Sequence, residues 1–226
     1  MNQVERILKI FYSPREVSSV LKERPDWFIP VLVLLVVSLL SHYLIYPSIL
    51  KPQQLRAIDD DPRFSPAQRE EIRGRLEGNI PLVAGLVGRT VVTVIWLLLG
   101  SALLWGVFSL MGGEGRFKQV FSVFCYSSLI GAVAIAVKTG LQLAKDSLFV
   151  YTSAAIAVPG FPPNSPLVRF LDNLDIFALW QLWVLTVGLG VVFSFNTKKS
   201  AIGVLSMWAV WVVASTLLFG RFMPGR

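Results

Sequence analysis

Long runs of apolar residues without a formal charge constrain this chain more than any other feature of its sequence. A helix needs about 20 such residues to cross the roughly 30 Å hydrocarbon core of a bilayer. Five segments meet or approach that length, at residues 27–46, 90–111, 120–137, 176–195 and 201–219. Backbone polar groups find no water in hydrocarbon, so such segments cross it as helices. The sequence therefore predicts an all-α, polytopic membrane bundle with five transmembrane helices.

The composition supports this class. Hydrophobic residues make up 54% of the chain and charged residues only 15%, against roughly 25% charged in an average soluble domain. The net charge of +7 on so apolar a chain favours anionic lipid head groups over nucleic acid as the partner. With one cysteine, Cys125, and one histidine, His42, neither an intrachain disulfide nor a histidine-cluster metal site is expected. We expect the His42 side chain to bond a carbonyl.

Residues 1–26 are interpreted as an amphipathic tail of two short helices before the membrane domain of residues 27–226. Ser13-Pro14-Arg15-Glu16 has the pattern of a capping box with proline at the first helical position. Two placements remain open for this tail. It either lies flat on the membrane surface or packs on the bundle's own loops.

Two further segments outside the spans have a recognisable character. Ser65-Pro66-Ala67-Gln68 repeats the capping pattern and predicts an extramembrane helix over about 65–77, with Glu71 and Arg75 placed to pair. Residues 147–158 are apolar but too short to cross, which indicates an interfacial or re-entrant segment. Pro47 is expected to end the first span.

Five spans place the two termini on opposite sides of the membrane. With the N-terminus inside, nine Lys and Arg residues lie inside and 12 outside, but half of the outer ones share one long loop with acidic residues. The two shortest loops each hold a basic pair beside a span, namely Arg116 with Lys118, and Lys198 with Lys199. Because of these basic pairs, we favour, under the positive-inside rule, a chain in the cell membrane with its N-terminus in the cytoplasm.

Polar side chains near the membrane are candidates for function because they are costly there. The candidate polar site consists of Lys138, Gln142, Asp172, Asp175 and Gln181. If Lys138 and Asp175 meet, they could form an ion pair that lines a pocket. In the alternative interpretation all of these side chains, and Arg89, sit at the interface, where Lys138 and Arg89 reach out to head groups.

Small residues at a spacing of four indicate close helix packing in the third span. The ridge consists of Ser128, Ala132, Ala136 and Gly140. Packing within the bundle is favoured over association between copies of the chain.

No catalytic constellation and no cofactor motif is present in the sequence. Gly112-Gly113-Glu114-Gly115 lacks the strand before it and the Lys-Ser/Thr after it that a phosphate loop needs, so it is interpreted as a turn. We therefore expect neither enzymatic activity nor a bound cofactor or metal.

The order of these elements resembles the Yip family of Ypt/Rab-interacting membrane proteins, in its short bacterial-type form. The resemblance covers nearly the whole chain. It rests on residues 10–27 at the entry to the first span, and on the turn Gly112, Gly113, Phe117 and Lys118 with residues 119–123 and Tyr126-Ser127. In the last two spans it rests on residues 171–180, residues 198–201 and Trp208. The resemblance implies a five-span bundle with a cytoplasmic N-terminus and no enzymatic activity. The chain lacks the D-L-Y-G-P motif of eukaryotic members, so no residue carries over for binding a Rab-type GTPase.

Two functions follow as hypotheses. The first is a non-enzymatic adaptor or organiser of membrane components, with other membrane proteins or further copies of itself as partners. The second is a small transporter or channel that uses a polar site near Lys138, Gln142, Asp175 and Gln181. A cavity that reaches Lys138 and Gln181 would favour transport, and a bundle packed shut around them would favour the adaptor.

Overall fold

The computed structural model describes residues 1–163 and 165–222, and its regular elements are all helical. Five helices are long and apolar enough to cross a membrane, at Phe28–Asp59, Ile80–Leu110, Phe117–Lys145, Ile176–Phe193 and Thr197–Thr216. The predicted all-α bundle with five candidate spans is thereby confirmed.

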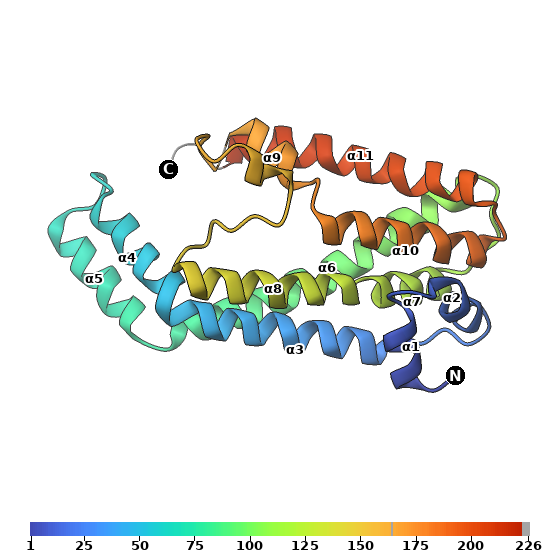
Figure 1. The fold of residues 1–226 in the computed structure, drawn as a ribbon. Helices are drawn as coiled ribbons and strands as arrows, with labels where there is room; N and C mark the ends of the chain where they lie inside the picture. Colours follow the sequence, from blue (N-terminus) through green and yellow to red (C-terminus); the bar gives the residue numbers. More distant parts are fainter. Residues whose placement is uncertain (164, 223–226) are drawn as a thin grey trace.

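The spans are assembled from eight helical elements, and the long ones run side by side along the bundle (Figure 1). They are α3 (Phe28–Ile45), which continues through η1 (Tyr46–Leu50) into α4 (Lys51–Asp59), then α6 (Ile80–Leu110), the consecutive pair α7 (Phe117–Ser127) and α8 (Leu129–Lys145), and finally α10 (Ile176–Phe193) and α11 (Thr197–Phe222). The α7–α8 pair is the most buried of the five spans and packs on α3, α6 and α10.

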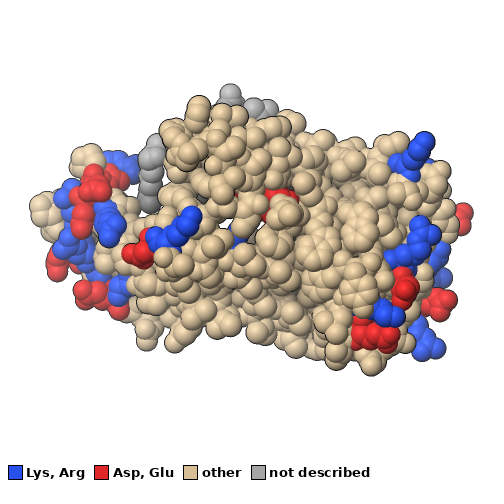
Figure 2. Space-filling view, viewed as in Figure 1, with Lys and Arg blue, Asp and Glu red and all other residues tan. Residues whose placement is uncertain are grey.

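The bundle has two ends of different build. At the N-terminal end lie α1 (Gln3–Lys9), α2 (Pro14–Glu23) and the turns 111–116 and 194–196. At the other, the loop end, lie α4, α5 (Pro66–Glu77) and the segment 146–175, which holds η2 (Ala154–Ala157) and α9 (Pro166–Asp172). Charged side chains gather at the two ends and leave a mostly uncharged middle (Figure 2), as expected for a chain surrounded by acyl chains.

The helix of the first span does not end at Pro47, contrary to the sequence prediction. It continues as one wide π-helical turn, Tyr46–Leu50, and then as α4. Proline has no N–H and its ring clashes with the carbonyl four residues earlier, so a regular α-turn is unfavourable here. The wider turn accommodates the ring without ending the helix.

The capping box predicted at Ser13 is also absent, because the Ser13 side chain caps no N–H group. The Ser13 backbone N–H instead donates to the Lys9 carbonyl, and the Glu16 carboxylate forms an ion pair with Lys9 at 2.9 Å. Hydrogen bonds from Lys9 to Glu16 and then Glu5 raise the pKa of the Lys9 ammonium. The equivalent box at Ser65 is confirmed, as is the Glu71–Arg75 pair at 2.7 Å.

The N-terminal tail packs on the bundle. Ile10, Val17 and Leu21 are fully buried, and α2 lies against both α10 and α7. The contact is closest at Gly188, where an added Cβ would lie 2.6 Å from Val123 and 2.8 Å from the Ser18 hydroxyl. On α1, by contrast, Val4, Leu8 and the nearby Tyr12 are exposed. The tail therefore docks through α2 and turns an apolar face of α1 outward.

Gly188 tests this docking. Replacing Gly188 with Leu should lower the free energy of unfolding by about 1–3 kcal/mol, because the new side chain overlaps Val123 and Ser18 in a filled core. Thermal unfolding of the purified chain in detergent measures the change. Gly140→Leu is the matched control, since a Cβ on Gly140 meets no atom within 4 Å. Equal losses in the two variants would contradict the proposed contact.

Candidate functional site

An ion pair between two spans forms the centre of the candidate site. The Lys138 Nζ of α8 lies 2.9 Å from a carboxylate oxygen of Asp175, which precedes α10. The side chain of Asp175 is 9% exposed and that of Lys138 31% exposed. Asp175 also caps α10 by accepting from the Phe177 N–H at 2.8 Å, and it accepts from the Thr152 hydroxyl. The carboxylate thus joins α8, α10 and the segment before α9.

The other polar candidates divide around this pair. Asp172 accepts a 2.8 Å hydrogen bond from Ser153, and the Gln181 amide donates to the Ser128 hydroxyl at 3.4 Å. Gln142 turns to the Leu148 carbonyl at 3.2 Å instead of joining the pair. The structure therefore brings four of the five candidates to one cavity and leaves Gln142 outside its lining.

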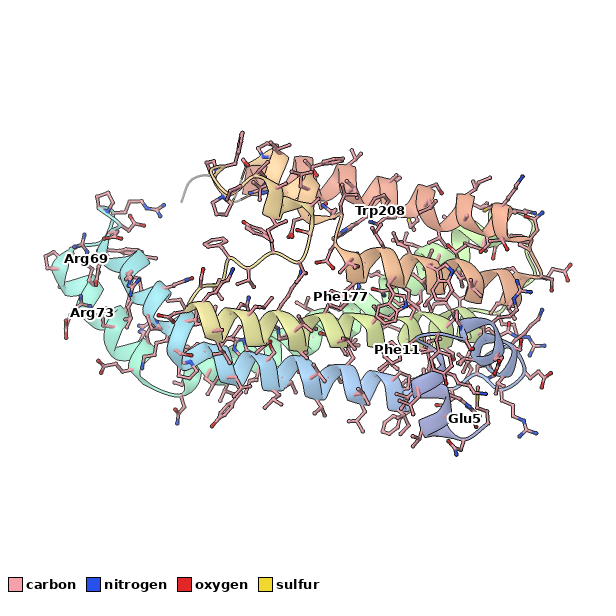
Figure 3. All side chains as sticks on the ribbon, viewed as in Figure 1. Glu5, Phe11, Arg69, Arg73, Phe177 and Trp208 are labelled. Carbon is pink, nitrogen blue, oxygen red and sulfur yellow. The ribbon has the colours of Figure 1, made fainter. Side chains whose placement is uncertain are left out.

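This main cavity has a volume of about 600 Å³ and lies between α6, α8, α10 and α11. Its lining is largely apolar, with Lys138, Asp172 and Asp175 at the loop end and Gln181 further along α10. Phe177 and Trp208, labelled in Figure 3, contribute aromatic walls from α10 and α11. An apolar chamber with a few convergent polar groups is the usual form of a small-molecule site.

Residues 147–158 bond the two aspartates at the polar end of the main cavity, through the Thr152 and Ser153 hydroxyl groups. This segment has no long helix, only the 3₁₀ turn Ala154–Ala157, and a backbone bridge links Ser153 to Asp175. Its hydroxyl donors Thr152 and Ser153 were not among the sequence candidates. The run Tyr151-Thr152-Ser153 in an otherwise apolar segment between spans is the sequence signal that could have pointed to them.

The small-residue ridge divides along α8. Ser128 and Ala132 are buried, and Ser128 meets Gln181, whereas Ala136 and Gly140 lie on an exposed face. The adjacent Thr139 is buried instead and bonds the Ser41 hydroxyl of α3 at 2.6 Å. The close packing of α8 on α3 therefore involves a face next to the second half of the ridge.

The predicted turn at Gly112 and Gly113 lies at the N-terminal end of the bundle, between α6 and α7. Gly112 adopts a left-handed φ of +85°, which glycine permits without strain. A Cβ on Gly113 would overlap the Phe193 ring. Beyond the turn, Phe117 stacks on Phe121, while the Lys118 side chain is exposed.

The expected bond from His42 to a carbonyl is not found, because its buried Nε2 atom has no hydrogen-bond partner. The imidazole lies against Gly85 of α6, where a Cβ would overlap it. Among the described residues, no group of three His, Cys, Asp or Glu side chains is arranged to hold a metal ion.

The ion pair can be tested by its contribution to stability. Lys138→Met should lower the free energy of unfolding by about 1–3 kcal/mol, because it removes the charged partner of a buried carboxylate. Lys145→Met, on the exposed end of the same helix, is the control and should change it by less than about 1 kcal/mol. Thermal unfolding in detergent distinguishes them, and an unaffected Lys138→Met would contradict the assignment.

Comparison with known proteins agrees with this architecture. The Yip1 domain matches residues 8–219. The chain is 22% identical over 200 residues to "Membrane protein YknW" of Bacillus subtilis (strain 168), covering 86% of this chain and 81% of that protein. No solved structure gives a significant match. A domain match over nearly the whole chain, on five apolar spans, shows that this chain belongs to the Yip1 family of membrane proteins.

Proposed function

We propose that this Yip1-family chain is a non-enzymatic membrane protein that adapts or organises other membrane components. The observation that carries the proposal is the closed packing of the N-terminal end. There the rings of Phe108, Phe193 and Phe195 lie within 5.0–5.9 Å of one another, under the glycine turn. The buried side chains Val120, Val123 and Leu189 continue this packing inward. Packing of this kind closes one end of the bundle, which favours a rigid scaffold over an open conduit.

The docked tail supports the same proposal. Because α2 is held by α10 and α7, the N-terminal end has a fixed surface. Its exposed charges come from α2, from the turn 111–116 and from the first turns of α7 and α11, and they are Arg15, Glu16, Glu23, Arg24, Glu114, Arg116, Lys118 and Lys198. We infer that this surface is cytoplasmic, since basic pairs beside short loops follow the positive-inside rule. Other membrane proteins or further copies of the chain are the proposed partners.

A small transporter is the second candidate, and one observation favours it. The main cavity reaches both Lys138 and Gln181, which is the feature expected of a transport site. The packed N-terminal end would have to open for a solute to pass, as alternating access requires. Transport and adaptor functions therefore differ in whether the chain moves solutes by itself.

Reconstitution separates the two candidates. Liposomes holding the purified chain should be no more permeable to potassium chloride, sodium glutamate or glycerol than empty liposomes, measured by light scattering after an osmotic step. In cells that lack the gene, the Lys138→Met variant should complement the deletion as well as the unmodified chain does, at equal protein level. Solute entry, or loss of activity at normal protein level, would favour transport.

Site-directed photo-crosslinking in cells tests the adaptor role directly. A photoreactive residue at Arg15 or Lys118 should give discrete products with the same partner protein, because both positions lie on the fixed surface of the N-terminal end. Leu103, an exposed apolar residue of α6, is the control and should contact mainly lipid. Absence of protein products from both charged positions would contradict the proposal for this surface.

A further inference from the structure

A second cavity lies beside the main one. It measures about 480 Å³ and is lined by residues of α3, α6 and α8 and by Gln181 of α10. Trp96, Gly131 and Gln181 line both cavities, so the two are neighbours. Gly88, Val92 and Trp96 of its lining are exposed, which indicates that protein does not seal this side.

Arg89 gives the second cavity an uncompensated positive charge. Arg89 lines the space, and the buried Nη1 of its guanidinium has no hydrogen-bond partner among the described residues. None of the ion pairs found in the described part of the chain involves Arg89, whereas Lys138 in the main cavity is neutralised by Asp175. A half-buried cation with a buried, unbonded N–H group and no counter-charge is costly. A bound anion would therefore gain more in the second cavity than in the main one.

The position of Arg89 along α6 identifies the source of such an anion. Arg89 precedes the end of α6 at Leu110 by 21 residues, which at 1.5 Å per residue is roughly the 30 Å thickness of the hydrocarbon core. If Leu110 marks one boundary of that core, Arg89 lies at the level of the opposite head groups. Val92 and Trp96 then line the same cavity at acyl-chain depth.

We propose that the second cavity binds a membrane phospholipid, with the phosphate on Arg89 and an acyl chain along Val92 and Trp96. A guanidinium presents paired N–H donors that match two phosphate oxygens. Hydroxyl groups of Ser38, Thr93 and Ser128 also line the space and can serve the head group or its ester carbonyls. The recognised chemistry is a lipid phosphodiester in a site open to the bilayer. This inference does not rest on the adaptor or the transport proposal.

Native mass spectrometry of the full chain in nonionic detergent tests the lipid class. The probes are phosphatidylglycerol, phosphatidylcholine, diacylglycerol with the same acyl chains, and inorganic phosphate. Both phospholipids should give a one-to-one adduct, since each carries the phosphodiester, and diacylglycerol should bind about tenfold more weakly. Inorganic phosphate at millimolar concentration should not displace the phospholipid, because it cannot fill the apolar part of the cavity.

Variants then assign the adduct to this cavity. Arg89→Gln should weaken the phosphatidylglycerol adduct about tenfold, and Arg89→Lys by less, since it retains the charge. Lys145→Gln, which removes one exposed cation near the loop end, is the matched control and should leave the adduct unchanged. The melting temperature of each variant without added lipid shows whether that variant is folded. If Arg89→Gln does not fold, the comparison of lipid classes on the unmodified chain still tests the proposal.

Three results would overturn the proposal. Diacylglycerol could bind as well as the phospholipids, which would remove the role of the phosphate. Inorganic phosphate could displace the lipid, which would indicate a site for a free anion. Finally, Lys145→Gln could weaken binding as much as Arg89→Gln, which would leave only unspecific attraction to the surface.

Discussion

The absence of water from the bilayer core determines most of this structure. Each backbone N–H and C=O in the spans must bond within its own segment, so the helical path continues through Pro47 in the first span and from α7 into α8 in the third. Because acyl chains solvate leucine and valine, these helices gain little from burying such side chains against one another. Their association depends instead on close contacts, such as Gly188 against Ser18 and Val123, and on a few buried polar bonds.

The polar bonds and the packed rings are distributed unequally along the bundle. At the N-terminal end, α2 and the phenylalanine cluster fill the space between helices. Toward the loop end the spans diverge around two neighbouring cavities, and the Lys138–Asp175 pair ties α8 to α10 beside the larger one. The packed end is where we propose partner contacts, and the half with the cavities is where we propose a bound lipid.

Sequence patterns predicted the spans well because their signal is compositional and local. Their ends were harder to place: α6 begins at Ile80, ten residues before the predicted start, since a helix at the interface tolerates Arg89 as easily as a loop does. The meeting of Lys138 and Asp175 was foreseen only as a condition, because it depends on how the spans pack. Thr152 and Ser153 could not be foreseen as partners of the two aspartates, since the path of residues 146–175 is a tertiary property.

Membrane topology tests the central claim of five crossings most directly. Single cysteines are introduced at Ser19, Lys118 and Gly74 and as a C-terminal extension, in a chain with Cys125→Ser, and intact cells are labelled with a membrane-impermeant maleimide. Gly74 and the C-terminus should be labelled from outside, whereas Ser19 and Lys118 should react only after permeabilisation. Labelling of the two termini from the same side would contradict an odd number of spans and with it the account given above.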